Sequence, residues 1–151
     1  MDQLEHPRPG VFSLKAKPPE AGMCIPQRVD KRWGWELIFM NEWTNLLRVD
    51  EEDEYKMVPN KYCMKILHIN EGEETSMHFH KTKHETFIVT KGILIIEFND
   101  GRGMQDRREL KENEGFVVPP GFQHRLIART EVELIEASTP DSPEDSFRVA
   151  L

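Results

Sequence analysis

Short apolar runs separated by turn residues dominate the sequence from Trp33 onward. Each run has four to eight residues and is rich in branched and aromatic side chains, which favour strands. Glycine, proline and asparagine lie between the runs and indicate tight turns. The runs cover residues 35–40, 45–49, 62–69, 85–89, 93–98, 115–119, 125–128 and 132–137. Their length and spacing predict a single all-β domain, built as a sandwich or a barrel.

The first 30 residues differ from the rest in composition. Five prolines, at positions 7, 9, 18, 19 and 26, interrupt every short apolar stretch there. Because proline breaks regular elements, we expect residues 1–30 to form an extended arm and residues 31–151 to form the folded domain. The acidic segment Asp50–Lys56 is the one stretch that could form a helix, although its crowded carboxylates fit a solvated loop as well.

Composition narrows the classes of partner. The chain has 151 residues and a net charge of −7, which gives no bias toward nucleic acid or anionic membranes. No apolar run is long enough to span a bilayer, and the polar start lacks a signal-peptide core, so a cytoplasmic location is expected. In that compartment Cys24 and Cys63 are expected as reduced thiols, with Cys63 a small buried residue of an apolar strand.

Four residues form a candidate ligand set for one divalent metal ion. His78 and His80 are two apart, so in a strand their side chains point to the same face. Glu85 has the opposite parity and can join them only if the chain turns at residues 81–84, which are polar and basic. His124 completes a set of three imidazoles and one carboxylate.

The residues around this set support the same geometry. His84 has the opposite parity to Glu85 and is expected at the surface. Gly72 and Gly92 lie where tight reversals favour a positive φ, and the turn at residues 119–121 would aim His124 inward. Four ligands leave two open positions on a six-coordinate ion, and Mn, Fe, Co, Ni and Zn all accept such nitrogen and oxygen donors.

The segment that contains His78, His80 and Glu85 and the segment that contains His124 resemble the two motifs of the cupin superfamily. The first motif is matched at every defined position by Gly72-x5-His78-x-His80-x4-Glu85-x6-Gly92. The core of the second is matched by Pro119-x-Gly121-x2-His124. Two positions differ from the second motif. Asn113 stands where the motif usually has glycine, and Ala128 stands where it usually has asparagine. The resemblance implies a double-stranded β-helix, the cupin jelly roll, with the metal inside the barrel mouth.

From Lys31 to Val149 the chain is similar to the cupin mannose-6-phosphate isomerases and their sugar isomerase-like relatives. Those enzymes commonly carry glutamine where this chain has His78. The similar segments include Arg32-Trp33-Gly34-Trp35-Glu36, Tyr62-x2-Lys65-x-Leu67, Leu110-x2-Asn113-Glu114-Gly115, His124-Arg125-Leu126, Leu134-Ile135-Glu136 and Glu144-Asp145-x2-Arg148. This resemblance implies a metal-dependent enzyme that acts on a sugar or a sugar phosphate.

Two basic residues are candidates for substrate contact. Lys65 lies between Met64 and Ile66, in the middle of an apolar run, where lysine is disfavoured unless it faces solvent or a pocket. We assign it as a candidate catalytic residue, either as a charge facing the substrate or as a desolvated base. Arg148 could bind an anionic substrate or lie exposed on an edge strand.

Three functions are compatible with these residues. The leading hypothesis is an isomerase or epimerase, in which the ion polarises a carbonyl or hydroxyl while a base moves a proton. The alternatives are a non-haem Fe or Ni oxygenase of the cupin type, and a non-enzymatic cupin that binds a sugar or another small ligand. By resemblance to small cupins, and because the arm has no apolar core of its own, a homodimer is expected.

Overall fold

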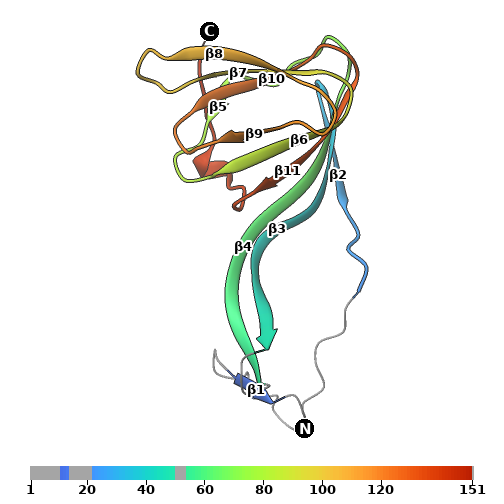
Figure 1. The fold of residues 1–151 in the computed structure, drawn as a ribbon, viewed down its shortest axis with the longest axis vertical. Coiled ribbons are helices and arrows are strands. Elements are labelled where there is room, and N and C mark those ends of the chain that lie inside the picture. The colour runs from blue at the N-terminus through green and yellow to red at the C-terminus, as the bar shows by residue number, and fades with distance from the viewer. Residues whose placement is uncertain (1–10, 14–21, 50–53, 151) are drawn as a thin grey trace. The chain divides into compact units, whose positions relative to one another are not determined.

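The computed structural model describes the backbone of residues 11–13, 22–49 and 54–150, and the side chains of residues 22–41 and 62–150. The chain divides into two compact units, one of residues 1–24 and 43–61 and one of residues 25–42 and 62–151. We call the second the barrel unit. All the residues of the candidate site described below lie in it, and its layers are visible in Figure 1.

Nearly all of the described residues in regular elements are in strands, so the all-β prediction is confirmed. The strands are β1 (Val11–Ser13), β2 (Gln27–Lys31), β3 (Gly34–Val49), β4 (Glu54–Ile69), β5 (His78–Phe79), β6 (Glu85–Lys91), β7 (Leu94–Asn99), β8 (Gln105–Leu110), β9 (Gly115–Val118), β10 (Gln123–Ala128), β11 (Val132–Ser138) and β12 (Phe147–Arg148), and a 3-10 turn, η1, covers Pro143–Asp145. Within the described residues, no helix is long and apolar enough to cross a membrane.

The strands form two antiparallel sheets, as a jelly roll requires. One sheet has the order β2-β3-β4-β11-β6-β9, with β1 paired to β4, and the other has the order β12-β5-β10-β7-β8. In the barrel unit the two sheets form two layers, with β5, β7, β8 and β10 in one and β6, β9 and β11 in the other (Figure 1). The double-stranded β-helix architecture is therefore confirmed.

Some boundaries differ from those expected. The runs 35–40 and 45–49 lie in one continuous strand, β3, and residues 54–56 of the helix-capable segment are part of β4, whereas residues 50–53 lie outside the described residues. Strand β2 occupies 27–31, at the end of the expected arm, and pairs with β3. Residues 1–10 and 14–21 of that arm lie outside the described residues. Strand β8 has no apolar pattern because it is an edge strand, and only Leu110 of it is buried.

Inward-facing side chains change from apolar to polar along the barrel. On β4 the inward residues pass from Leu67 to Lys65, and on β6 they pass from Phe87 to Glu85, with the apolar part of both strands in one core. The same change occurs on β10 at His124 and on β11 at Glu136. Cys63, at the polar end of β4, is a buried free thiol, as expected. One end of the barrel is thus a closed apolar core, and the other carries the charged site.

Turn residues with a positive φ set the strand reversals. Gly72 and Gly92 have φ values of 79° and 84°, which confirms the conformations expected for them. A Cβ atom at Gly92 would lie 2.1 Å from the carbonyl oxygen of Glu131, so this turn also needs the absence of a side chain. Asn113, which replaces the family's glycine, has a φ of 68°. Asparagine tolerates this left-handed conformation, so the substitution preserves the turn.

We predict that Gly92→Ala lowers the free energy of unfolding by at least ~2 kcal/mol, because it combines a left-handed backbone with a steric overlap. Gly101→Ala is the matched control, since Gly101 has a φ of 75° but no atom within 4 Å of the added Cβ. It should cost only about 1 kcal/mol. Urea denaturation of the two variants makes the comparison, and equal losses would contradict the close approach at Gly92.

Candidate metal centre

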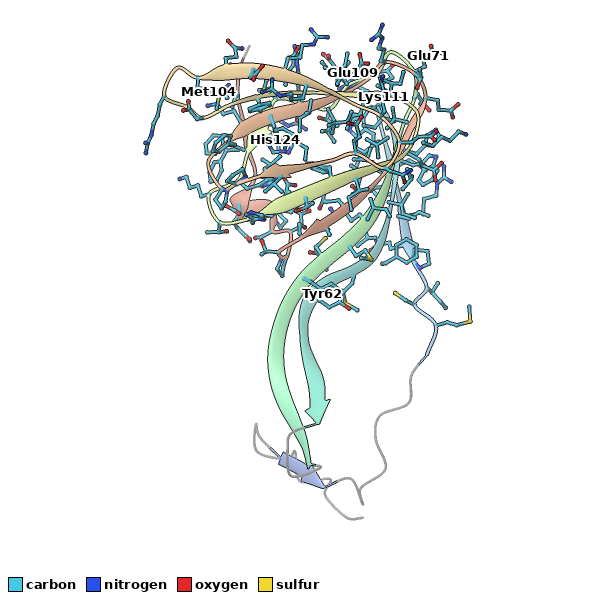
Figure 2. The ribbon with its side chains drawn as sticks, in the orientation of Figure 1. Tyr62, Glu71, Met104, Glu109, Lys111 and His124 are labelled. Carbon is cyan, nitrogen blue, oxygen red and sulfur yellow. The ribbon has the colours of Figure 1, made fainter. Side chains whose placement is uncertain are left out.

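Two neighbouring strands bring the three predicted histidines together. His78 is on β5 and His80 directly follows it, whereas His124 is on β10 and pairs across the ladder with His78. The ring centroids of His78 and His124 are 4.5 Å apart, and those of His78 and His80 are 5.1 Å apart. One ligand atom from each of the three rings lies within 4.8 Å of the others, a spacing that could hold a metal ion. In Figure 2, His124 lies between the two layers of strands.

The turn before β10 connects the two motif segments. The backbone N–H of Gly121, which has a φ of 87°, donates a hydrogen bond to the carbonyl of His80 at 2.6 Å. The next amide, of Phe122, bonds the Pro119 carbonyl at 3.3 Å and closes the turn. The prolines and glycine therefore place the first residues of β10 against the end of β5, and His124 is 1% exposed there.

Each of the three rings is oriented by a hydrogen bond from its Nδ1 atom to a backbone carbonyl. Because a carbonyl can only accept, each Nδ1 carries a proton, and in the neutral ring Nε2 then presents a lone pair. Metal-binding histidines commonly have this arrangement, which fixes both the tautomer and the ring orientation. The carbonyl partners are Ser76 for His78 (2.8 Å), Asp145 for His80 (2.7 Å) and Phe122 for His124 (3.1 Å).

Glu85, the first residue of β6, faces these nitrogen atoms. Its Oε2 atom lies 3.0 Å from Nε2 of His124, and its Oε1 atom lies 3.6 Å from Nε2 of His80. Glu85 Oε2 and His124 Nε2 are both buried and neither has a hydrogen-bond partner. At this distance the two atoms need a metal ion or a proton between them to be satisfied. The residues present therefore fit a divalent ion held by three nitrogens and one oxygen.

The charge states of His78 and Glu85 suit the same role. Burial and the neighbouring His124 ring lower the pKa of His78 from 6.5 to about 4, so this imidazole is neutral at pH 7. Burial opposes ionisation of Glu85, but the facing His124 ring and the Lys83 ammonium outweigh it and hold its pKa below the ordinary value. The site therefore offers at least one neutral imidazole nitrogen, from His78, and an ionised carboxylate.

The corner between His80 and Glu85 is fixed by one carboxylate that the sequence reasoning missed. Asp145, in η1, accepts hydrogen bonds from the backbone amides of Lys81, Thr82 and Lys83 at 2.8–3.2 Å. The turn expected at residues 81–84 is thus present, and Glu85 joins the histidines as the parity argument requires. His84 is exposed, as expected. No local pattern reveals this role of Asp145, because it is 62 to 64 residues away from the amides that it binds.

A polar pocket of about 230 Å³ opens from these residues and is lined by both sheets. Lys65 lines it, as expected, and is 4% exposed. Its ammonium lies 3.0 Å from Oδ2 of Asp141 and 3.8 Å from Oε2 of Glu36. Burial lowers the pKa of Lys65, but Glu136, Glu36 and Asp141 outweigh it and raise the pKa. Of the two roles considered for Lys65, a positive charge fits this environment better than a base.

Lys83 is a second buried lysine in the same pocket, and the sequence reasoning missed it. It is 3% exposed, and its ammonium lies 3.0 Å from Glu85, 3.0 Å from Glu136 and 3.3 Å from Asp141. These carboxylates outweigh burial and raise its pKa, so it is charged. Extending the two-residue parity of β6 backwards from Glu85 would have placed Lys83 on the inner face.

The pocket continues into a smaller cavity of about 170 Å³ with a basic lining. Three cationic side chains, a tryptophan and a serine line it, and none of its lining residues is acidic. Arg148 is exposed on the edge strand β12, and no carboxylate of the described residues forms an ion pair with it. The lining residues are Lys31, Arg32, Trp33, Ser76 and Arg148.

Comparison with known proteins agrees with the motifs and the architecture. The family model described as the cupin domain matches residues 65–137. Residues 65–137 are therefore similar to the cupin domain. The match includes His78, His80, Glu85 and His124, and together with the jelly roll it supports the cupin superfamily. Comparison with curated proteins finds no match to this chain.

Several solved structures share the fold. The capsular polysaccharide assembling protein CapF from Staphylococcus aureus is 16% identical, with a TM-score of 0.64 over 83% of this chain and 34% of its own. Oxalate decarboxylase from Bacillus subtilis, a protein with Mn(II) centres, is 15% identical, with a TM-score of 0.63 over 93% of this chain and 32% of its own. KdgF from Halomonas sp. is 15% identical, with a TM-score of 0.54 over 73% of this chain and 81% of its own.

At such identities these likenesses show the fold alone. The chain spans about a third of the length of the CapF and oxalate decarboxylase chains that it matches. The chemistry of this chain must therefore be argued from the residues of the site itself.

We predict that the purified protein binds about one divalent ion per chain, and that His80→Ala and His124→Ala each lose most of it, because each removes a buried nitrogen ligand. His84→Ala is the matched control and should keep full occupancy, since its ring is exposed. Elemental analysis after loading with Mn²⁺ or Zn²⁺ gives the stoichiometry. Full occupancy in either buried-histidine variant would show that the ligand set is misassigned.

Proposed function

We propose that this protein is a metal-dependent isomerase or epimerase that acts on a sugar or sugar phosphate, with the ion held by His78, His80, Glu85 and His124. The observation that carries the proposal is the convergence of three Nε2 lone pairs and one carboxylate in a pocket lined mainly by polar and charged residues. Such a lining suits a small, hydroxyl-rich substrate better than an apolar one.

A divalent ion at this site would act as a Lewis acid on a carbonyl or hydroxyl group, and thereby ease removal of a neighbouring proton. With four ligands from the protein, two positions of a six-coordinate ion remain for substrate oxygens. The walls of the pocket come from both sheets, so they surround the reacting group and limit its exposure to water.

The remaining charged residues can be assigned roles by their contacts. Lys65, held as an ammonium, places positive charge beside developing oxyanion character and can donate hydrogen bonds to hydroxyl groups. Proton transfer then needs a carboxylate as the base. Glu136 and Asp141 each form an ion pair with a lysine at 3.0 Å. The contacts of Glu36 are longer, at 3.4 Å to Lys31 and 3.8 Å to Lys65, so its carboxylate is less tightly paired. We therefore assign Glu36 as the candidate base.

The basic cavity beside the pocket supports a substrate with an anionic group. Arg148 has no ionic partner among the described side chains, and Lys31 and Ser76 line both cavities. A phosphate bound there would gain charge-assisted hydrogen bonds from the guanidinium while the rest of the sugar extends toward the histidines. This arrangement favours a sugar phosphate over an uncharged sugar.

We predict that the metal-loaded protein exchanges a substrate proton with deuterated water for at least one member of a panel of aldoses, ketoses and their phosphates. Glu36→Gln should reduce the exchange rate by about 10²–10⁴-fold, the usual contribution of a general base, while leaving metal content unchanged. Lys65→Met should lower the rate and substrate affinity together. Proton NMR measures the exchange. An absence of exchange across the whole panel, with oxygen consumed instead, would contradict the proposal and favour an oxygenase.

For a phosphorylated substrate, Arg148→Ala should raise KM about tenfold or more, because it removes a charge-assisted contact worth about 1.5–3 kcal/mol. The unphosphorylated analogue should be unaffected. Arg102→Ala, at an exposed arginine in the β7–β8 turn, is the matched control for loss of surface charge. Equal effects of Arg148→Ala on both substrates would argue against the anionic subsite.

A further inference from the structure

Lys83 poses a question that the proposed function does not answer. It is an ammonium group with only 3% exposure, and it contacts Glu85, the one carboxylate of the candidate metal site. A buried cation costs several kcal/mol unless it is fully paired. Two further carboxylates, Glu136 and Asp141, complete its pairing. The fold thus places a cation beside a site that is itself built to bind one.

The two oxygens of Glu85 have different surroundings. Oε1 lies 3.0 Å from the Lys83 ammonium, and 3.6 Å from Nε2 of His80. Oε2 lies 3.0 Å from Nε2 of His124 and has no hydrogen-bond partner. A free carboxylate can bind a metal ion through one oxygen or through both. Here the ammonium already engages Oε1, whereas Oε2 has no hydrogen-bond partner and lies closer to an imidazole nitrogen than Oε1 does.

We propose that Lys83 is a positioning residue that restricts Glu85 to coordination through Oε2 alone. The consequence is an additional open position on the ion, because a carboxylate bound through both oxygens would fill a site that a substrate oxygen needs. The inference rests on the metal site of the proposed function but not on the reaction, since it concerns only how the ion is coordinated.

Lys83 is held from both ends, as a positioning role requires. Its backbone amide donates to Oδ2 of Asp145 at 3.0 Å, so the corner cannot shift without breaking that turn. Its ammonium is anchored by Glu136 on β11, and the same Glu136 oxygen also accepts a hydrogen bond from Ser138 at 3.1 Å. Rotation of Lys83 away from Glu85 would leave buried carboxylates unpaired, which is costly.

The alternative is that Lys83 only neutralises the buried carboxylates and has no influence on the ion. Metal affinity alone does not separate the two roles, because removing a nearby cation also changes the electrostatic attraction for Mn²⁺. The number of water molecules on the ion does separate them. If Glu85 becomes free to bind through both oxygens, it displaces one water, and the count falls without loss of the ion.

The experiment is water-proton relaxation of the Mn²⁺-loaded protein, at equal metal occupancy, in wild type, Lys83→Met, Lys83→Arg and Lys81→Met. We expect the inner-sphere contribution to fall by about half in Lys83→Met, as one of two waters is lost. Lys83→Arg should restore it, because a guanidinium can still engage Oε1. Lys81→Met should match wild type, since Lys81 is exposed and lies over the Phe147 ring.

A double variant tests whether the effect passes through Glu85. In the Glu85→Gln background, Lys83→Met should cause no further fall, because an amide binds through one oxygen only. If Lys83→Met does not fold, Lys83→Gln replaces it. An unchanged relaxation in Lys83→Met, or the same fall with and without Glu85→Gln, would overturn the proposal. Failure to find a sugar substrate would leave it intact, because no turnover is measured.

Discussion

Three hydrogen bonds, from imidazole Nδ1 atoms to backbone carbonyls, decide what this barrel can do. Each bond uses the proton of its ring and turns the other nitrogen, with its lone pair, toward the same point. Without them the rings could rotate or change tautomer, and the buried histidines would only leave polar atoms without partners in the protein interior. With them, the set requires a cation, and Glu85 supplies the negative charge that makes binding one favourable.

The same strands supply both the core and the site. On β4, β6, β10 and β11 the inward positions are apolar at one end and polar at the other, so the chain obtains its stability and its chemistry from one alternating pattern. The apolar part forms one buried core between the two sheets and keeps the polar part in register. The charged groups at the open end are paired with one another, which lets them stay ionised in a buried place.

Local patterns predicted what depends on neighbours in the sequence. The short apolar runs predicted the strands, and the glycine positions predicted the turns. The two-residue period of a strand placed His78 and His80 on one face and His84 at the surface. The orienting partners could not be predicted in this way. Asp145 and Glu136 meet the ligand segment only through tertiary folding, and β8 has an edge strand's polar composition. Lys83 was within reach of the parity argument, but residues 81–84 were assigned to a turn because they are polar and basic.

The central claim is that three imidazoles and one carboxylate bind a single ion. X-ray absorption at the metal edge of the Zn²⁺- or Mn²⁺-loaded protein tests it most directly, because scattering from imidazole rings is distinct from that of water or carboxylate. The account predicts three imidazoles with oxygen donors in the remaining positions, falling to two imidazoles in His124→Ala. A spectrum with one imidazole or none, or one that does not change in His124→Ala, would contradict it.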